Sequence, residues 1–164
     1  MSALSGDPKS HPDSEFADGL TGSCLCGSIT VTIHDKELFT KKRGHLCHCA
    51  NCRKVAGTYV AANFAIEKEK VEIKDDKGTL KTYEDWNTGS GKKVDRKFCG
   101  ACGSPILSEP QLTPHMVVLK MGLFPRIPAP EFEAFAAHKH EWENTIPGLE
   151  VQYETARGGK KLGE

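Results

Sequence analysis

The chain has 164 residues, and 22 Lys and Arg residues balance 22 Asp and Glu residues, so the formal net charge is zero. This length is enough for one domain with its own core. A neutral chain without a basic run has no electrostatic reason to bind nucleic acid or an anionic membrane surface, and we expect neither partner.

Polar segments form both ends of the chain. Residues 1–18 are rich in Ser, Asp, Pro and Gly and lack the apolar segment of a secretory signal, and residues 156–164 are similarly polar. We expect mobile tails at 1–18 and 156–164 around one domain at 19–155. No apolar run approaches the ~20 residues of a membrane helix. We therefore expect a cytoplasmic protein, in which cysteines stay reduced.

Short apolar or alternating stretches predict a domain built mainly of β-strands. In chain order the predicted strands are Ser28–Ile33, Tyr59–Ile66, Val71–Ile73, Leu80–Tyr83, Val94–Phe98 and His115–Met121. A helical turn is predicted at Cys52–Ala56. Residues Pro130–Ala137 predict either a short helix or an edge strand, after a loop that contains three prolines.

Seven cysteines fall into three tight groups, which are Cys24-Leu-Cys26, Cys47-His-Cys49-Ala-Asn-Cys52 and Cys99-Gly-Ala-Cys102. Such spacing is typical of thiolates that surround a soft metal ion. In the last group the two sulfurs of a Cys-x-x-Cys turn point at one ion. The first pair can share an ion only if the backbone bends, which Gly22 and Gly27 would permit.

The preferred division of the cysteines places the central three around one zinc ion and the two outer pairs around another. This division uses all seven thiols, and it gives one closed site and one site with an open position. The alternative, in which one outer cysteine joins the central three, leaves three thiols unused. His48 is a further candidate ligand, but on an extended segment it points away from the ion that Cys47 and Cys49 hold.

A site made of one Zn²⁺ ion and three thiolates has a net charge of −1, and its ion is a weak Lewis acid. It suits a soft fourth ligand, which indicates a thiol or a thiol adduct as the substrate and a reaction at a carbon–sulfur bond. Arg53 and Lys54 follow Cys52 directly and would either bind a substrate carboxylate or lie solvated on the surface. We expect no ligand role for five other histidines or for the tryptophans, which are His34, His45, His115, His138, His140, Trp86 and Trp142.

The three motifs, in this order, resemble the glutathione-dependent formaldehyde-activating enzyme family, also called the centromere-protein-V type. The segments that carry the resemblance are Gly22–Ile29, Cys47–Lys54 with Gly57, and Arg96–Gly103, and the resemblance extends from about Leu20 to Tyr153. It implies a mainly β, compact fold with two zinc ions, related to the methionine sulfoxide reductase B and zinc-ribbon-like folds.

The resemblance also implies roles for the cysteines and an activity. Cys24, Cys26, Cys99 and Cys102 would hold a structural zinc ion, and Cys47, Cys49 and Cys52 a catalytic one. The implied reaction forms S-hydroxymethylglutathione from glutathione and formaldehyde, formally as a carbon–sulfur lyase. The alternative is a non-catalytic zinc module that binds a protein partner. A thiol redox enzyme is a third hypothesis, but it needs a free reactive cysteine, and the preferred division leaves none.

Overall fold

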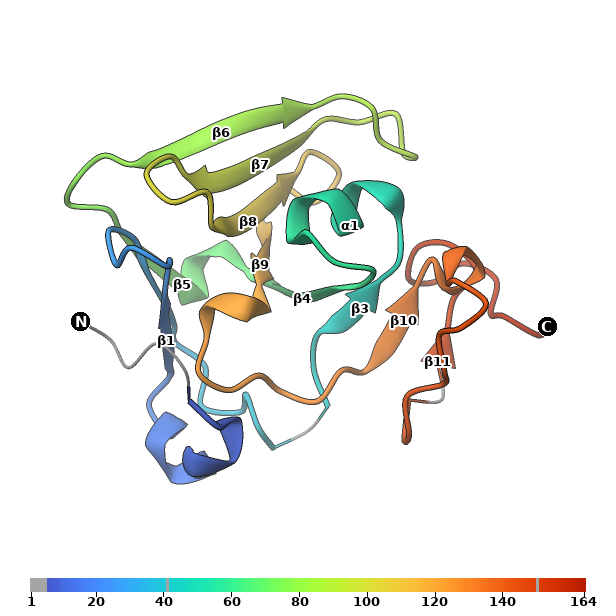
Figure 1. The fold of residues 1–164 in the computed structure, drawn as a ribbon, viewed down its shortest axis with the longest axis horizontal. Helices are drawn as coiled ribbons and strands as arrows, with labels where there is room; N and C mark the ends of the chain where they lie inside the picture. The colour runs from blue at the N-terminus through green and yellow to red at the C-terminus, as the bar shows by residue number, and fades with distance from the viewer. Residues whose placement is uncertain (1–5, 41, 150) are drawn as a thin grey trace.

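The computed structural model describes residues 6–40, 42–149 and 151–164, and it shows a mainly β fold with two sheets (Figure 1). The smaller sheet has the order β1-β2-β5 and consists of β1 (Leu20–Ser23), β2 (Thr30–Ile33) and β5 (Val71–Lys74), all antiparallel. The larger sheet has the order β11-β10-β3-β4-β9-β8-β7-β6.

Most strands of the larger sheet pair as antiparallel neighbours, while β10 runs parallel to both β3 and β11. Their bounds are β3 (His45–Cys47), β4 (Ala61–Glu67), β6 (Leu80–Asp85), β7 (Val94–Cys99), β8 (Pro105–Pro110), β9 (Met116–Lys120), β10 (Phe132–Ala134) and β11 (Val151–Gln152). The described residues contain a single α-helix, α1 (Ala50–Ala56). Short 3-10 turns occur at Pro8–Ser10, Asp13–Phe16, Lys68–Lys70, Met121–Leu123 and Ala136–His138.

The mainly β prediction is confirmed, and the predicted strands match β2, β4, β5, β6, β7 and β9. For Pro130–Ala137 the predicted strand is confirmed as β10, but the expected edge position is wrong, because β10 lies between β3 and β11 and all three of its residues are buried. Four strands were not predicted. β3 and β11 are too short to show a period, β1 lacks apolar alternation, and β8 begins and ends at a proline, a residue that normally indicates the end of a strand.

The two faces of the larger sheet bury different kinds of side chain. Phe64 and Ile66 of β4 and Leu119 of β9 enter the main core, which Val31 and Ile33 of the smaller sheet also help to form. Because side chains alternate along a strand, the residues between them belong to the opposite face. Helix α1 packs against β4 there (Figure 1).

The two terminal segments make contacts with the domain. Phe16 is buried and its ring lies 5.1 Å from that of Phe39, while Arg126 bonds the carbonyl of His11. At the other end, Lys161 forms a β-bridge with Tyr153. Residues 1–5 of the predicted N-terminal tail lie outside the described residues, and the mobility of both tails stays a prediction. In the described part of the chain, no helix has the length and apolar character needed to cross a membrane.

Gly22 in β1 allows the smaller sheet to approach the turn after β9. A Cβ atom at this position would lie 2.5 Å from the backbone oxygen of Leu123. We therefore expect Gly22→Ala to lower the free energy of unfolding by about 1–3 kcal/mol, as overpacking does. Gly89→Ala is the control, because its Cβ would meet nothing within 4 Å, and we expect a change within about 0.5 kcal/mol. Urea unfolding measures both, and equal stabilities would contradict this role.

Candidate metal centres

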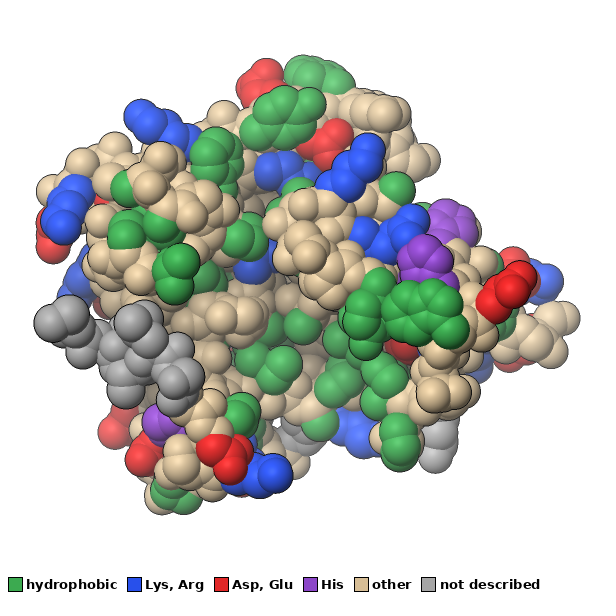
Figure 2. Space-filling view, viewed as in Figure 1, with side chains coloured by type: hydrophobic (Ala, Val, Ile, Leu, Met, Phe, Trp, Pro, Cys, Tyr) green, Lys and Arg blue, Asp and Glu red, His purple; other side chains and the backbone are tan. Residues whose placement is uncertain are grey.

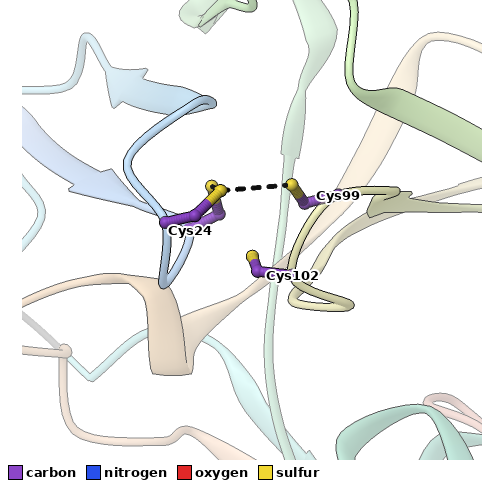
Figure 3. Close-up of side chains that lie close together, drawn as sticks. Cys24, Cys99 and Cys102 are labelled. Carbon is purple, nitrogen blue, oxygen red and sulfur yellow. Dashed lines mark hydrogen bonds between the residues drawn. The ribbon is translucent and has the colours of Figure 1, made fainter.

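The two outer cysteine pairs meet at one point between the sheets. Cys24 and Cys26 lie in the turn that joins β1 to β2, and Cys99 and Cys102 lie at the end of β7 and in the turn before β8. Their four sulfur atoms all lie within 4.8 Å of one another. In Figure 3 the labelled Cys24 comes from one turn, Cys99 and Cys102 come from the other, and the sulfurs point into a common centre. We call these four residues the tetrad.

The sulfur separations in the tetrad fit a metal ion. Cys26 Sγ lies 3.6 Å from Cys24 Sγ and 3.7 Å from Cys99 Sγ. A regular tetrahedron with metal–sulfur bonds of about 2.3 Å has sulfur–sulfur edges of about 3.8 Å. All seven cysteines are free thiols. The tetrad therefore has the donor atoms and the spacing of a closed zinc site.

Backbone turns on both sides shape the tetrad. Gly27 has a φ of 73°, and its N–H bonds the carbonyl of Cys24, which closes the first turn. Gly103 has a φ of 76°, and its N–H bonds the carbonyl of Cys99. The bend expected at Gly22 is absent, because Gly22 is part of the regular strand β1. The glycine after each pair, rather than the one before it, permits the turn.

The environment makes the thiols of the tetrad unequal. Burial raises the pKa of Cys24 to about 11. Burial acts in the same direction on Cys102, but hydrogen bonds from the side chain and backbone of Ser104 outweigh it and lower its pKa to about 6. The Ser104 hydroxyl also accepts a hydrogen bond from the N–H of Leu25, so one serine connects the two turns.

The central cysteines form a second cluster, which we call the triad. Cys47 ends β3, Cys49 is the N-cap of α1, and Cys52 lies in the first turn of the helix, with the N–H of Cys52 3.4 Å from Cys49 Sγ. The three sulfurs lie within 4.8 Å of one another. They pack with Phe132 and Ala134 of β10, in a small cluster separate from the main core that surrounds the tetrad. The protein thus offers two sulfur clusters in different environments.

Hydrogen bonds among the three thiols divide their protons unevenly. Bonds from Cys47 and Cys49 lower the pKa of Cys52 to about 2, whereas donation to its neighbours, together with burial, raises the pKa of Cys47. Close thiolates repel one another, and either shared protons or a bound cation relieves that repulsion. Among the described residues the cluster has three thiol donors and no fourth protein donor, which fits a zinc ion with one open position.

His48 does not belong to the triad's donor set. It is 2% exposed, and its Nε2 lies 3.0 Å from Glu133 Oε1. Its Nδ1 lies 3.1 Å from Glu143 Oε2, close enough for an ion pair but without hydrogen-bond alignment. Glu133 is fully buried in β10 and also pairs with Lys139. The imidazole therefore connects the triad's loop to the C-terminal segment, a contact that no motif in the sequence indicates.

A row of polar side chains, half-buried at His45 and buried at Asn63 and Lys120, crosses the sheet beside the triad. His45 of β3 lies opposite Asn63 of β4, and Asn63 lies opposite Lys120 of β9, so the three side chains share the face that also carries Cys47. Burial lowers the pKa of His45 to about 4. Burial also lowers the pKa of Lys120, although the nearby Cys52 thiolate opposes that shift. Only strand register reveals this row, because its members are far apart in the sequence.

Two cavities adjoin the triad region. The larger has a volume of about 590 Å³ and includes Cys47, Phe132 and Phe135 in its wall, and its basic side chains are Lys42, Arg43 and Arg157. Arg43 is paired with Asp35, and Arg157 with Glu131. The smaller cavity, of about 340 Å³, lies between α1 and strands β6 and β7 and includes Asn51, Lys54, Arg96 and Lys97.

The two predicted substrate cations are separated by the turn of the helix. Lys54 lines the smaller cavity, whereas Arg53 Nη1 donates to His140 Nε2 at 3.0 Å. His140 stacks on Trp142, which is 65% exposed and also contacts the ring of Tyr59. At the right of the face drawn in Figure 2, histidine side chains lie next to hydrophobic ones. The substrate-binding role of Arg53 and Lys54 stays a prediction.

Comparison with known proteins gives one family. The profile described as "Glutathione-dependent formaldehyde-activating enzyme" matches residues 19–143, a range that contains the tetrad and the triad. A crystal structure of a Rhodobacter sphaeroides protein, a structural genomics target, has 18% identity and a TM-score of 0.49, with 63% of this chain and 86% of that chain covered. No curated protein matches the chain significantly. Because the profile match covers most of the chain, the chain belongs to the glutathione-dependent formaldehyde-activating enzyme family.

Proposed function

We propose that the protein is a zinc-dependent carbon–sulfur lyase that acts on glutathione or a related thiol adduct, in a reaction like the synthesis of S-hydroxymethylglutathione. The triad carries this proposal: three sulfurs lie within 4.8 Å of one another, and Cys47 lines a cavity of about 590 Å³. The family description supports the same thiol and the same electrophile.

The two clusters suit different roles. The tetrad offers four sulfurs, which complete the coordination of a zinc ion, and it links strands of both sheets, so we propose a structural zinc ion there. Cys47, Cys49 and Cys52 would hold the catalytic ion. When bound, that ion supplies the charge that keeps a substrate sulfur deprotonated. The free thiols are consistent with the proposed cytoplasmic location.

The substrate enters, in this proposal, through the larger cavity. Its volume is within the range of small-molecule sites, and its walls combine apolar rings with basic side chains. Glutathione carries two carboxylates and one thiol, so cations at the rim would bind the carboxylates while the sulfur reaches the triad. The fixed position of β3, between β10 and β4, keeps Cys47 at the cavity wall.

Removal of metal should separate the two centres. We expect gently purified protein to contain two zinc ions, and a mild chelator to remove the ion at the triad first, because its open position admits the chelator. Elemental analysis before and after chelation measures this.

Cys24→Ser or Cys99→Ser should cause unfolding or insolubility, because metal binding there contributes folding free energy. Cys49→Ser should leave a folded protein with one zinc ion and no activity.

Equal losses of thermal stability in the two classes of variant would contradict the separate roles. A single tightly held zinc ion with four free thiols would reject the division of the cysteines into a tetrad and a triad.

A bound thiol should complete the coordination of the triad's metal. Cobalt-substituted protein titrated with glutathione should show a new thiolate-to-metal absorption band, and zinc-loaded protein should accelerate adduct formation from glutathione and formaldehyde. Oxidised glutathione, which has no thiol, is the matched control and should leave the spectrum unchanged. If millimolar glutathione causes no spectral change and no acceleration, the non-catalytic zinc module is the better reading.

Charge removal at the two cavities should identify the carboxylate site. We expect Lys42→Ala and Arg157→Ala to raise the KM for glutathione about 3- to 10-fold each with little change in kcat, because partly exposed charge pairs contribute about 1 kcal/mol. Arg53→Ala and Lys54→Ala are the matched pair from the other side of the triad. If instead the Arg53 and Lys54 variants raise KM and the first pair does not, the substrate lies against α1, as the sequence predicts.

A further inference from the structure

Two buried side chains near the triad have donor capacity that the described protein groups do not use. Asn63 is 1% exposed, and its Nδ2 has no hydrogen-bond partner. Lys120 is 5% exposed, and its Nζ donates to Asn63 Oδ1 at 2.9 Å, the one acceptor that the described residues provide. Burying an ammonium group and an amide in this way costs stability, and such unsatisfied groups often have a catalytic role.

The strand register places both donors beside the triad. Cys47 lies opposite Ala61, and Asn63 is two residues along β4, so Asn63 is the diagonal neighbour of Cys47 on the same face. Diagonal neighbours are about 7–8 Å apart, a distance that long side chains span. Lys120, opposite Asn63, is close enough to interact electrostatically with all three thiols of the triad.

We propose that Lys120 Nζ and Asn63 Nδ2 donate hydrogen bonds to one oxygen of the substrate. This oxygen is bonded to the carbon that forms the bond with sulfur. This inference rests on the proposed function and adds to it the residues that stabilise the developing negative charge. Donors fixed in a water-excluded site stabilise such charge more than they would in water. The Asn63 carbonyl holds the ammonium group in place, so the two residues act as a pair.

The step is balanced without a further reactant. A sulfur lone pair forms the carbon–sulfur bond while the carbonyl π bond breaks and its electrons move to oxygen. That oxygen accepts hydrogen bonds from Lys120 and Asn63. The proton that the thiol releases on binding is matched by the proton that the oxygen takes up from water. In the reverse direction the same donors stabilise the oxygen while the carbon–sulfur bond breaks.

A purely structural role makes a different prediction. If Lys120 only offsets the negative charge of the thiolates, its removal will weaken metal retention and thiol binding together. If Lys120 and Asn63 bind the substrate oxygen, both of those properties will survive, and only states that carry the oxygen will be destabilised.

The test compares Lys120→Met, Lys120→Arg and Asn63→Leu with the natural protein, each loaded with zinc. We expect Lys120→Met to retain two zinc ions, to bind glutathione with a Kd within about threefold by calorimetry, and to lose about 10²- to 10³-fold in kcat. Lys120→Arg should recover part of the loss, because it keeps a charged donor. Asn63→Leu should show a similar loss, and the double variant should lose little more than either single one.

A second readout does not depend on turnover. With protein in excess over glutathione and ¹³C-formaldehyde, the NMR signal of the bound hydroxymethyl carbon measures the equilibrium on the protein. We expect Lys120→Met to lower the bound adduct about tenfold relative to bound glutathione, as expected for one lost hydrogen bond. Ser108→Ala is the matched control, because it removes a buried hydroxyl from the same face whose partner is Arg96. It should leave the equilibrium and kcat unchanged.

Each contrary result has a distinct meaning. Loss of one zinc ion or of glutathione binding in Lys120→Met assigns Lys120 to charge compensation and overturns the inference. An unchanged kcat and adduct equilibrium in both Lys120→Met and Asn63→Leu also overturns it, while the proposed function stands. If the natural protein forms no adduct and binds no glutathione, the proposed function fails and this inference fails with it.

Discussion

The arrangement of the whole molecule depends on the meeting of two turns at the tetrad. The smaller sheet contributes Cys24 and Cys26, and the larger sheet contributes Cys99 and Cys102, so the sulfurs connect segments that are 73 positions apart between Cys26 and Cys99. A metal ion at this point would close a long loop of the unfolded chain and stabilise the packing of β2 on β4 and β9. The main core packs against the tetrad, and this packing holds the larger sheet in place, including the face that carries the triad.

The opposite face combines features that a folding core avoids. It holds a buried lysine, a buried asparagine and three thiols under one helix, and its apolar cluster is small. Buried polar groups of this kind cost stability unless they are paired, so a protein keeps them where chemistry requires them. The main core on one face of the larger sheet thus offsets the cost of the buried polar groups on the other face. The tetrad lies with the main core, and the triad lies on the opposite face.

Contacts from the C-terminal segment complete the triad's surroundings. His48 lies between Glu133 and Glu143, and β10 inserts between β3 and β11. Loss of the Glu133 carboxylate would leave Nε2 of the buried His48 without its hydrogen-bond partner. The loop that holds Cys49 is therefore fixed from both sides, by α1 after it and by the C-terminal segment beside it, so a short loop holds this thiol in a defined position.

The sequence alone predicted the two groups of candidate metal ligands and the mainly β fold. Cysteine spacing is a local property, so the groups at Cys24, Cys47 and Cys99 predict metal ligands without knowledge of the fold, and alternation along β2 or β4 predicts strands. The residues that surround the triad come together only through tertiary packing. Asn63 and Lys120 meet through the register of β4 and β9, and Glu133 reaches His48 because β10 is an interior strand. Register depends on long-range packing of a whole sheet, and no spacing along the chain records it.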